Sequence, residues 1–344
     1  MNAKNSVVGL GIDVGGTSTE VVALSLGQDG LTLRSVIEYQ TAKYRSLGAA
    51  FDEEVRPVLG ESWPEEFGFV LCAAAGLPDD DGVTHFCYPG GRLAWDDLCR
   101  TVRRAGLSFG YGNDAEVQGG ILLHTRVHTI SESVQSGLPG SKQLNADTAL
   151  LFTLGTGSGT AFRVGERILT SEGGNRLVPA VIERLFPDLC ASVQGVLRGR
   201  DPEWTDQKWR AECLFSQSGL SDMAHVFTRQ AIRMPWEALC QAYRENAQLR
   251  ELAAEILGIS VGDWAVILKP AQVLLRCELL REVPAILTTP DGQAAFRRGI
   301  ERQPTRKELA LEVPVRLITI EDAQLIGMGL FAAKKWYPDL LACI

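Results

Sequence analysis

The N-terminal part of the sequence alternates short apolar runs with glycine-containing turns. Runs rich in Val, Ile and Leu, separated by Gly-Gly-Thr and Asp-Gly, predict three antiparallel strands over residues 7–13, 18–26 and 31–39. The pattern then predicts a helix over 47–59, a strand over 68–75, an amphipathic helix over 93–105 and a strand over 107–111. An antiparallel meander followed by alternating helix and strand indicates an α/β fold.

The same pattern begins again in the middle of the chain. A helix is predicted over 115–124, an exposed polar loop over 131–147, and strands over 148–154 and 160–164 around a Gly-Thr-Gly-Ser-Gly turn. This is a second copy of the strand, glycine-threonine turn and strand seen at the N-terminus, and it favours two related domains. The remainder is predicted to be helical over 179–257, a strand over 264–268, a strand over 313–318 and a closing helix over 322–335.

Composition supports two domains and a small-molecule partner. A chain of 344 residues is long for one hydrophobic core. A net charge of -8 without a run of five like charges argues against nucleic acid or anionic lipid as the partner. No apolar stretch reaches membrane-spanning length and the first residues lack a signal-peptide pattern, so we expect a cytoplasmic protein. The eight cysteines lie singly and form neither a zinc signature nor a disulfide framework.

The two glycine turns are candidates for holding phosphates. One such turn alone is an ordinary hairpin, but two turns with Gly, Thr and Ser can close N–H groups and hydroxyls around an anion. The sequence lacks GxxxxGK[ST], and the first turn precedes a strand, which excludes P-loop and dinucleotide-binding patterns. Asp13 is placed to hold Mg²⁺ through water, or alternatively to stabilise the turn. The predicted nucleotide-binding residues are Asp13, Gly15, Gly16, Thr17, Gly155, Thr156, Gly157 and Ser158.

Four ordered motifs resemble those of the bacterial glucokinases, which belong with the ROK sugar kinases to the actin-like ATPase superfamily. The motifs are Gly11-Ile12-Asp13-Val14-Gly15-Gly16-Thr17, Asn113-Asp114-Ala115, Leu154-Gly155-Thr156-Gly157-Ser158-Gly159 and Ser171-Glu172-Gly173-Gly174. A fainter likeness covers about 290–333. The resemblance implies two RNase H-like domains facing an interdomain cleft. Residues 1–113, joined by the closing helix 322–344, would form one, and 114–321, with a helical insertion at about 179–257, the other.

The resemblance also implies a function in carbohydrate metabolism, at the start of glycolysis. It implies an ATP- and Mg²⁺-dependent kinase, a transferase that phosphorylates a hexose, with glucose the first acceptor to test. Asp114 would be the general base that accepts the proton of the sugar hydroxyl, although an Asp there also suits helix capping. Asn113, Glu172 and Asn175 would bind the sugar substrate. A homodimer is the commonest assembly for such a chain.

Three departures from the family pattern keep an alternative open. Asn175 replaces the histidine of the family's Glu-Gly-Gly-His, and the cysteine cluster that holds zinc in ROK enzymes is missing, so no zinc is expected. After residues 264–268 the chain continues Lys269-Pro270-Ala271, where the family has a glycine-rich turn on the adenine side. The alternative is a catalytically degenerate ligand-binding or regulatory member of the same fold. A DNA-binding repressor is disfavoured by the acidic charge, and nothing singles out a filament-forming or chaperone-like ATPase.

Overall fold

The chain folds into two compact units. The computed structural model describes residues 6–15, 17–75, 83–85, 92–124, 127–137, 144–155, 157–171, 176–201, 203–229, 234–304 and 306–341. The first unit contains residues 1–125 and 322–344, and the second contains 126–321. The sequence analysis drew the boundary after residue 113. In the structure α4 (Asp114–Gln118) packs against the closing helix α15 (Ala323–Trp336) and lies in the first unit.

The first unit is built on a five-stranded sheet with the order β3-β2-β1-β4-β7. The strands β1, β2 and β3 form the predicted antiparallel meander, whereas β4 and β7 run parallel to β1. A separate pair, β5 and β6, forms a two-stranded sheet. The bounds are β1 Ser6–Val14, β2 Ser18–Gly27, β3 Gly30–Gln40, β4 Phe67–Ala74, β5 Val83–His85, β6 Arg92–Ala94 and β7 Ser108–Asn113.

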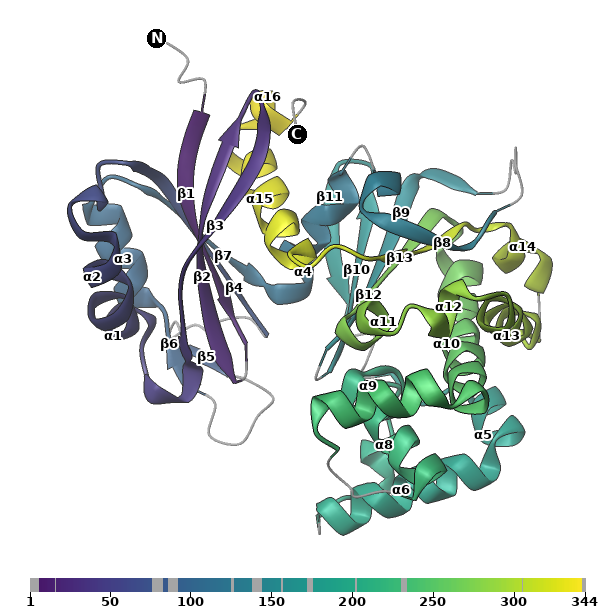
Figure 1. Cartoon of the computed structure of the whole chain (residues 1–344). Helices are drawn as coiled ribbons and strands as arrows, with labels where there is room; N and C mark the ends of the chain where they lie inside the picture. Colours follow the sequence, from purple (N-terminus) through teal and green to yellow (C-terminus); the bar gives the residue numbers. More distant parts are fainter. Residues whose placement is uncertain are drawn as a thin grey trace. The chain divides into compact units, whose positions relative to one another are not determined.

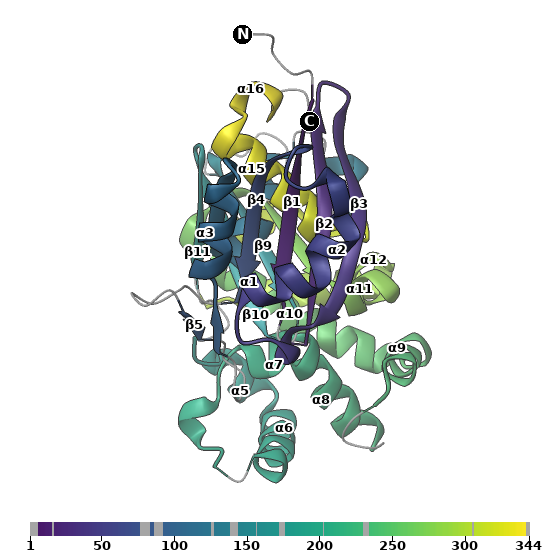
Figure 2. The ribbon, with the colours of Figure 1, turned by 90° about the vertical axis from the view of Figure 1, so that its left-hand side faces the viewer.

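Helices cover both faces of this sheet, as Figures 1 and 2 show. On one face, Ile12 packs with Phe51 and Leu98; on the other, Leu24 packs with Met328 of α15. Gly11 lets α15 approach, because a Cβ there would overlap the sulfur of Met328. The first face carries α1 (Leu47–Ala50), a π-helical turn (Phe51–Val55), α2 (Arg56–Leu59) and α3 (Asp96–Arg104), and the second carries α4, α15 and α16 (Pro338–Leu341).

The second unit repeats this plan with one added strand. Its sheet has the order β11-β10-β9-β12-β13-β8. The strands β9, β10 and β11 form an antiparallel meander, β12 and β13 run parallel to β9, and β8 is antiparallel at the edge. The predicted internal repeat is therefore confirmed. The bounds are β8 Ser131–Gln135, β9 Asn145–Leu154, β10 Ser158–Val164, β11 Arg167–Ser171, β12 Pro270–Cys277 and β13 Val315–Ile318.

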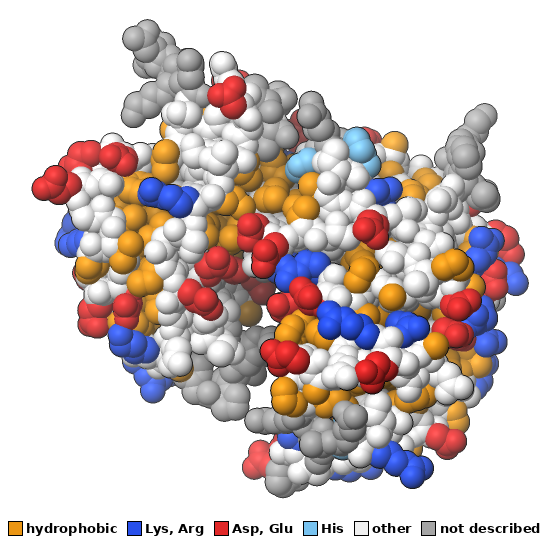
Figure 3. Space-filling model, in the orientation of Figure 1, with side chains coloured by type: hydrophobic (Ala, Val, Ile, Leu, Met, Phe, Trp, Pro, Cys, Tyr) orange, Lys and Arg blue, Asp and Glu red, His pale blue; other side chains and the backbone are white. Residues whose placement is uncertain are grey.

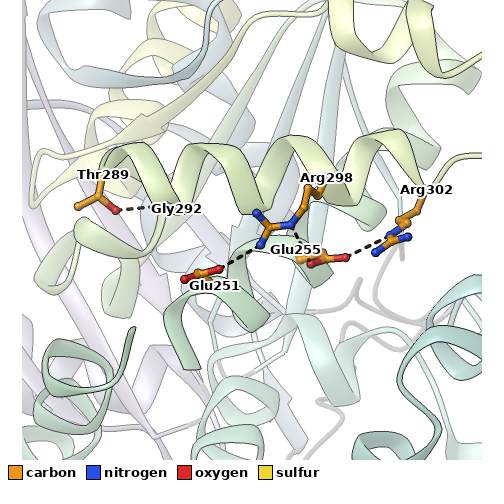
Figure 4. A network of polar contacts seen from close by, with 6 residues as sticks. All are labelled: Glu251, Glu255, Thr289, Gly292, Arg298 and Arg302. Atoms are coloured by element: carbon orange, nitrogen blue, oxygen red, sulfur yellow. Dashed lines mark hydrogen bonds and ion pairs between the residues drawn. The ribbon is translucent and has the colours of Figure 1, made fainter. Parts of the chain in front are cut away.

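Helices fill most of the rest of the second unit. The longest, α10, crosses α13 closely, since a Cβ on Gly258 or on Gly299 would overlap a backbone oxygen of the facing helix. Arg298 of α13 and Arg302, directly after its last residue, pair with Glu251 and Glu255 of α10 beside this crossing (Figure 4). The helices are α5 Ala180–Leu185, α6 Pro187–Arg200, α7 Glu212–Phe215, α8 Gln217–Thr228, α9 Trp236–Glu245, α10 Ala247–Leu268, α11 Glu278–Glu282, α12 Ala285–Thr288, α13 Pro290–Glu301 and α14 Lys307–Glu312.

Two sequence predictions are wrong. Residues 131–135, predicted to belong to an exposed loop, form β8 instead. These polar residues adopt a strand because they pair with β13, and their composition alone does not predict that pairing. Residues 264–268, predicted as a strand, form the end of α10, and Lys269 follows as its C-cap in the left-handed conformation with a φ of 49°. A short apolar run suits a buried strand or a buried helix equally well, and here it continues a long apolar helix.

None of the described helices combines the length and apolarity needed to span a bilayer. On the face of the molecule in Figure 3, acidic and basic side chains are interspersed.

Candidate active site at the sheet edges

Three parallel strands of the first unit end at one sheet edge and bring predicted site residues together. The register pairs Val14 of β1 with Ala74 of β4, and Ala74 with Asn113 of β7. Asp13 lies one residue before Val14, so it is two strands from Asn113, or about 10 Å by the usual strand spacing. The strand between them presents only small side chains there, Ala73 and Ala74. Ligands of open α/β sheets bind at this carboxyl edge.

The first glycine turn is stabilised by hydrogen bonds from Thr41, a residue that the sequence analysis missed. The N–H of Gly15 donates to the Ser18 oxygen at 3.0 Å, and a Cβ on Gly15 would lie 2.8 Å from that oxygen. Thr41 donates its hydroxyl to the Gly15 oxygen at 2.8 Å and its N–H to the Thr17 oxygen at 3.1 Å. The Thr19 hydroxyl lies 2.9 Å from that of Thr41. Gly15 and Thr17 are thus exposed on a turn whose shape is fixed by β2 and the segment after β3.

Two neighbouring residues at the junction of β7 and α4 have different roles: one caps the helix and the other is the candidate base. Asn113 is buried and caps α4, because its side-chain oxygen accepts the N–H of Ala115 at 2.9 Å. Asp114 follows as the first helical residue and is partly exposed, and its Oδ1 also accepts that N–H at 2.8 Å. Gly112 permits the sharp turn, since a Cβ there would lie 2.8 Å from Val117. Asn113 thus occupies the N-cap position of α4, and Asp114 shares its hydrogen bond.

Carboxylates line one face of the first sheet beside the first turn. Asp13, Glu20 and Glu38 lie in register on β1, β2 and β3, so their side chains share a face. Burial raises the pKa of Glu20 above its usual value, and the charges of Asp322 and Glu38 add to the rise. Such a concentration of negative charge favours a cation at this edge. Among the residues that the structure describes, no set of three His, Cys, Asp or Glu side chains encloses a metal position.

The second glycine turn lies at the carboxyl edge of the second sheet, where Leu154 of β9 is in register with Cys277 of β12. The N–H of Gly155 donates to the Gly157 oxygen at 2.9 Å. The N–H of Gln217, at the start of α8, donates to the Gly155 oxygen at 2.7 Å. A segment to which the sequence analysis assigned no chemistry therefore supports this turn. No local sequence pattern signals that contact.

The predicted site residues fall into three groups. Asp13, Gly15, Thr17, Asn113 and Asp114 lie at the edge of the first sheet, and Gly155, Gly157 and Ser158 lie at the edge of the second. Gly16, Thr156, Glu172 and Asn175 lie outside the described residues.

The adenine-side turn has to be sought at a different place from the one predicted. The strand parallel to β9 is β12, not 264–268. It ends in Arg276-Cys277, and α11 begins directly at Glu278. The expected glycine-rich turn is absent from this junction as well.

No protein-family model and no curated protein matches the sequence. Solved structures do match. Glucokinase from Balamuthia mandrillaris in complex with glucose is 18% identical with a TM-score of 0.72, over 97% of this chain and 95% of that one. Glucokinase from an Antarctic psychrotroph is 18% identical with a TM-score of 0.65, over 95% and 98%. A ROK family transcriptional regulator, a homologue of the Escherichia coli MLC protein, is 12% identical with a TM-score of 0.65, over 99% and 81%.

These likenesses show the fold. The chain has the two-domain actin-like ATPase fold shared by glucokinases and ROK-family proteins, and the predicted fold class is confirmed. At this level of identity the fold is common to enzymes and to a regulator, so activity has to be argued from the residues of the site.

Proposed function

We propose that the protein is an ATP-dependent carbohydrate kinase that transfers a phosphoryl group to a hexose, with glucose the first acceptor to test. The observation that carries the proposal is the strand register at the edge of the first sheet. In that register Asp13 lies two strands from Asn113, and the first glycine turn and Asp114 follow directly after these strands, in a fold similar to that of solved glucokinases. Phosphoryl transfer needs this combination of an anion-binding turn, a metal-binding carboxylate and a base.

The glycine turns supply the nucleotide contacts in this proposal. Hydroxyls and backbone N–H groups of the residues at 15–17 and 155–158 hold phosphate oxygens, apart from the N–H groups of Gly15 and Gly155, which bond within the turns. Asp13 holds Mg²⁺ through water, and the acidic face on which the pKa of Glu20 is raised fits a cation there. The metal, when bound, neutralises charge on the transferred phosphoryl group.

Asp114 accepts the proton of the attacking sugar hydroxyl as the oxygen–phosphorus bond forms. Its carboxylate is partly exposed at the sheet edge, which a proton acceptor needs in order to reach substrate. Asn113, whose side-chain oxygen accepts the helix-cap N–H, is proposed to bind a hydroxyl of the sugar. Glu172 and Asn175 are proposed to bind further sugar hydroxyls. Carbohydrate metabolism in the cytoplasm and assembly as a homodimer belong to the same proposal.

Thermal unfolding with and without Mg-ATP, followed by an ADP-release assay over hexoses, amino sugars and polyols, tests the proposal. A ligand that binds only the folded state raises the melting temperature. We expect a shift with Mg-ATP and ADP release that depends on one class of sugar. If Mg-ATP neither stabilises the protein nor is hydrolysed in the presence of any sugar, the kinase proposal is wrong.

A regulatory or ligand-binding protein of the same fold is the second candidate. Two features favour it: Asn175 stands where the family motif has histidine, and β12 runs straight into α11 without a glycine-rich turn. A ROK family transcriptional regulator has the same fold. This candidate predicts that a sugar stabilises the protein while no ADP is released.

A further inference from the structure

A small cavity of about 10 Å³ lies in the second unit directly beside the second glycine turn. Its polar lining comes from Ser158 and Thr160 of β10, from Arg176, and from Ser260 of α10. Apolar side chains, among them Phe152, form the rest of the wall. A space of this size with several polar groups holds about one water molecule.

Arg176 is held firmly at this cavity. Its Nη1 lies 3.0 Å from Asp263 Oδ2, and its Nη2 donates to the Ser260 hydroxyl at 2.6 Å. The guanidinium carbon lies 5.9 Å and 5.8 Å from the ring centres of Phe215 and Trp264. Burial lowers the pKa of Arg176, and the charge of Asp263 opposes the change. These contacts fix the guanidinium plane and therefore the direction in which its Nε–H points.

One of the other donors of this guanidinium, Nε, is buried and has no hydrogen-bond partner among the residues that the structure describes. A buried N–H of a charged group without a partner is costly, so native proteins rarely keep one. Arg176 and Ser158 both line the cavity, so a water in the cavity is the candidate for the missing acceptor.

We propose that one water in this cavity accepts the N–H of Arg176 Nε and hydrogen-bonds the hydroxyl of Ser158, which makes Arg176 a positioning residue for the second glycine turn. The role of that turn in binding phosphate rests on the function proposed above. The bridge fixes the rotamer of Ser158. The guanidinium of Arg176 then carries its positive charge close to the turn. Sequence gives no sign of this link, because Ser158 lies in the second glycine turn and Arg176 lies outside the four motifs.

A purely structural role for Arg176 is the competing explanation. Through Asp263 and Ser260 the side chain also ties the chain after β11 to α10. Two substitutions separate the roles. Asp263→Asn weakens the ion pair but leaves Nε and the cavity unchanged, whereas Arg176→Lys keeps a charge for Asp263 and removes the Nε–H.

The experiment is a double-mutant cycle with Ser158→Ala and Arg176→Lys, read by Mg-ATP affinity and by the urea midpoint of unfolding. Loss of either end of the bridge should weaken Mg-ATP binding about fivefold, the scale of one net hydrogen bond. The double variant should also lose about fivefold, whereas independent effects would multiply to about twenty-five-fold. Asp263→Asn serves as the control and should lower the urea midpoint with Mg-ATP affinity unchanged.

Two further outcomes keep this inference separate from the proposed function. If the wild-type protein binds no Mg-ATP, the kinase proposal fails, and the bridge is judged by coupling in the urea midpoints and by a high-resolution crystal structure. A water within hydrogen-bond distance of both Nε and the Ser158 hydroxyl supports the bridge. The inference is overturned if the changes in urea midpoint of the two single variants add up in the double variant. It is also overturned if the crystal structure shows no water in the cavity, or shows a protein side chain hydrogen-bonded to Nε.

Discussion

Replacing Asp114 by Asn separates proton acceptance from helix capping. Asn has almost the same shape and keeps the oxygen that accepts the Ala115 N–H, but it cannot take up a proton at neutral pH. Because Asn113 already caps α4, the loss in stability should be limited to the charge at the helix N-terminus, about 0.3–1 kcal/mol. Loss of a general base should lower kcat about 10²- to 10⁴-fold.

Asn113→Ala is the matched control for this prediction. It removes a buried N-cap with a 2.9 Å hydrogen bond, so it should cost about 0.5–2 kcal/mol of unfolding free energy. Both variants are compared by urea unfolding, by Mg-ATP affinity and by sugar-dependent ADP release. We expect Asp114→Asn to bind Mg-ATP as the wild type does and to lose turnover. If it instead keeps turnover and loses as much stability as Asn113→Ala, Asp114 is a structural residue and the assignment of the base is refuted.

Three further substitutions follow from the packing and the charges. Gly299→Ala should lower the free energy of unfolding by about 1–3 kcal/mol, because its Cβ would overlap the backbone of α10. Gly195→Ala, at an exposed position of α6, should raise it by about 0.5–1 kcal/mol. Equal urea midpoints for the two variants would contradict this prediction. Thr41→Val removes the hydroxyl that donates to Gly15 and should weaken Mg-ATP binding in calorimetry; unchanged affinity would show that the turn keeps its shape without it. Glu20→Gln should raise the melting temperature at pH 7, because the raised pKa makes the ionised carboxylate unfavourable in the folded state. That gain should disappear as the pH falls below the ordinary value of 4.5, where both states hold the proton, and a pH-independent gain would contradict the cause.

Local pattern was sufficient for the elements that have a strong period or a characteristic turn. The meander β1 to β3, the copied strands β9 and β10 and the closing helix α15 were all predicted, because alternating apolar runs and glycine turns specify them locally. The pattern did not suffice for β8, because its polar residues form a strand only through pairing with β13. It also did not separate helix from strand at the end of α10, where the apolar run has no period of its own.

The sequence by itself determined the architecture and named most of the candidate chemistry. The two glycine turns, Asp13 and the Asn113–Asp114 pair are readable because each lies at a strand end marked by glycine or by a polar dipeptide. Only the tertiary structure decided which of them share an edge, because strand register joins residues about a hundred positions apart. Only the tertiary structure showed that Thr41 supports the first turn, that α8 supports the second, and that Arg176 lies behind Ser158. These contacts depend on how distant segments pack, and no local pattern encodes them.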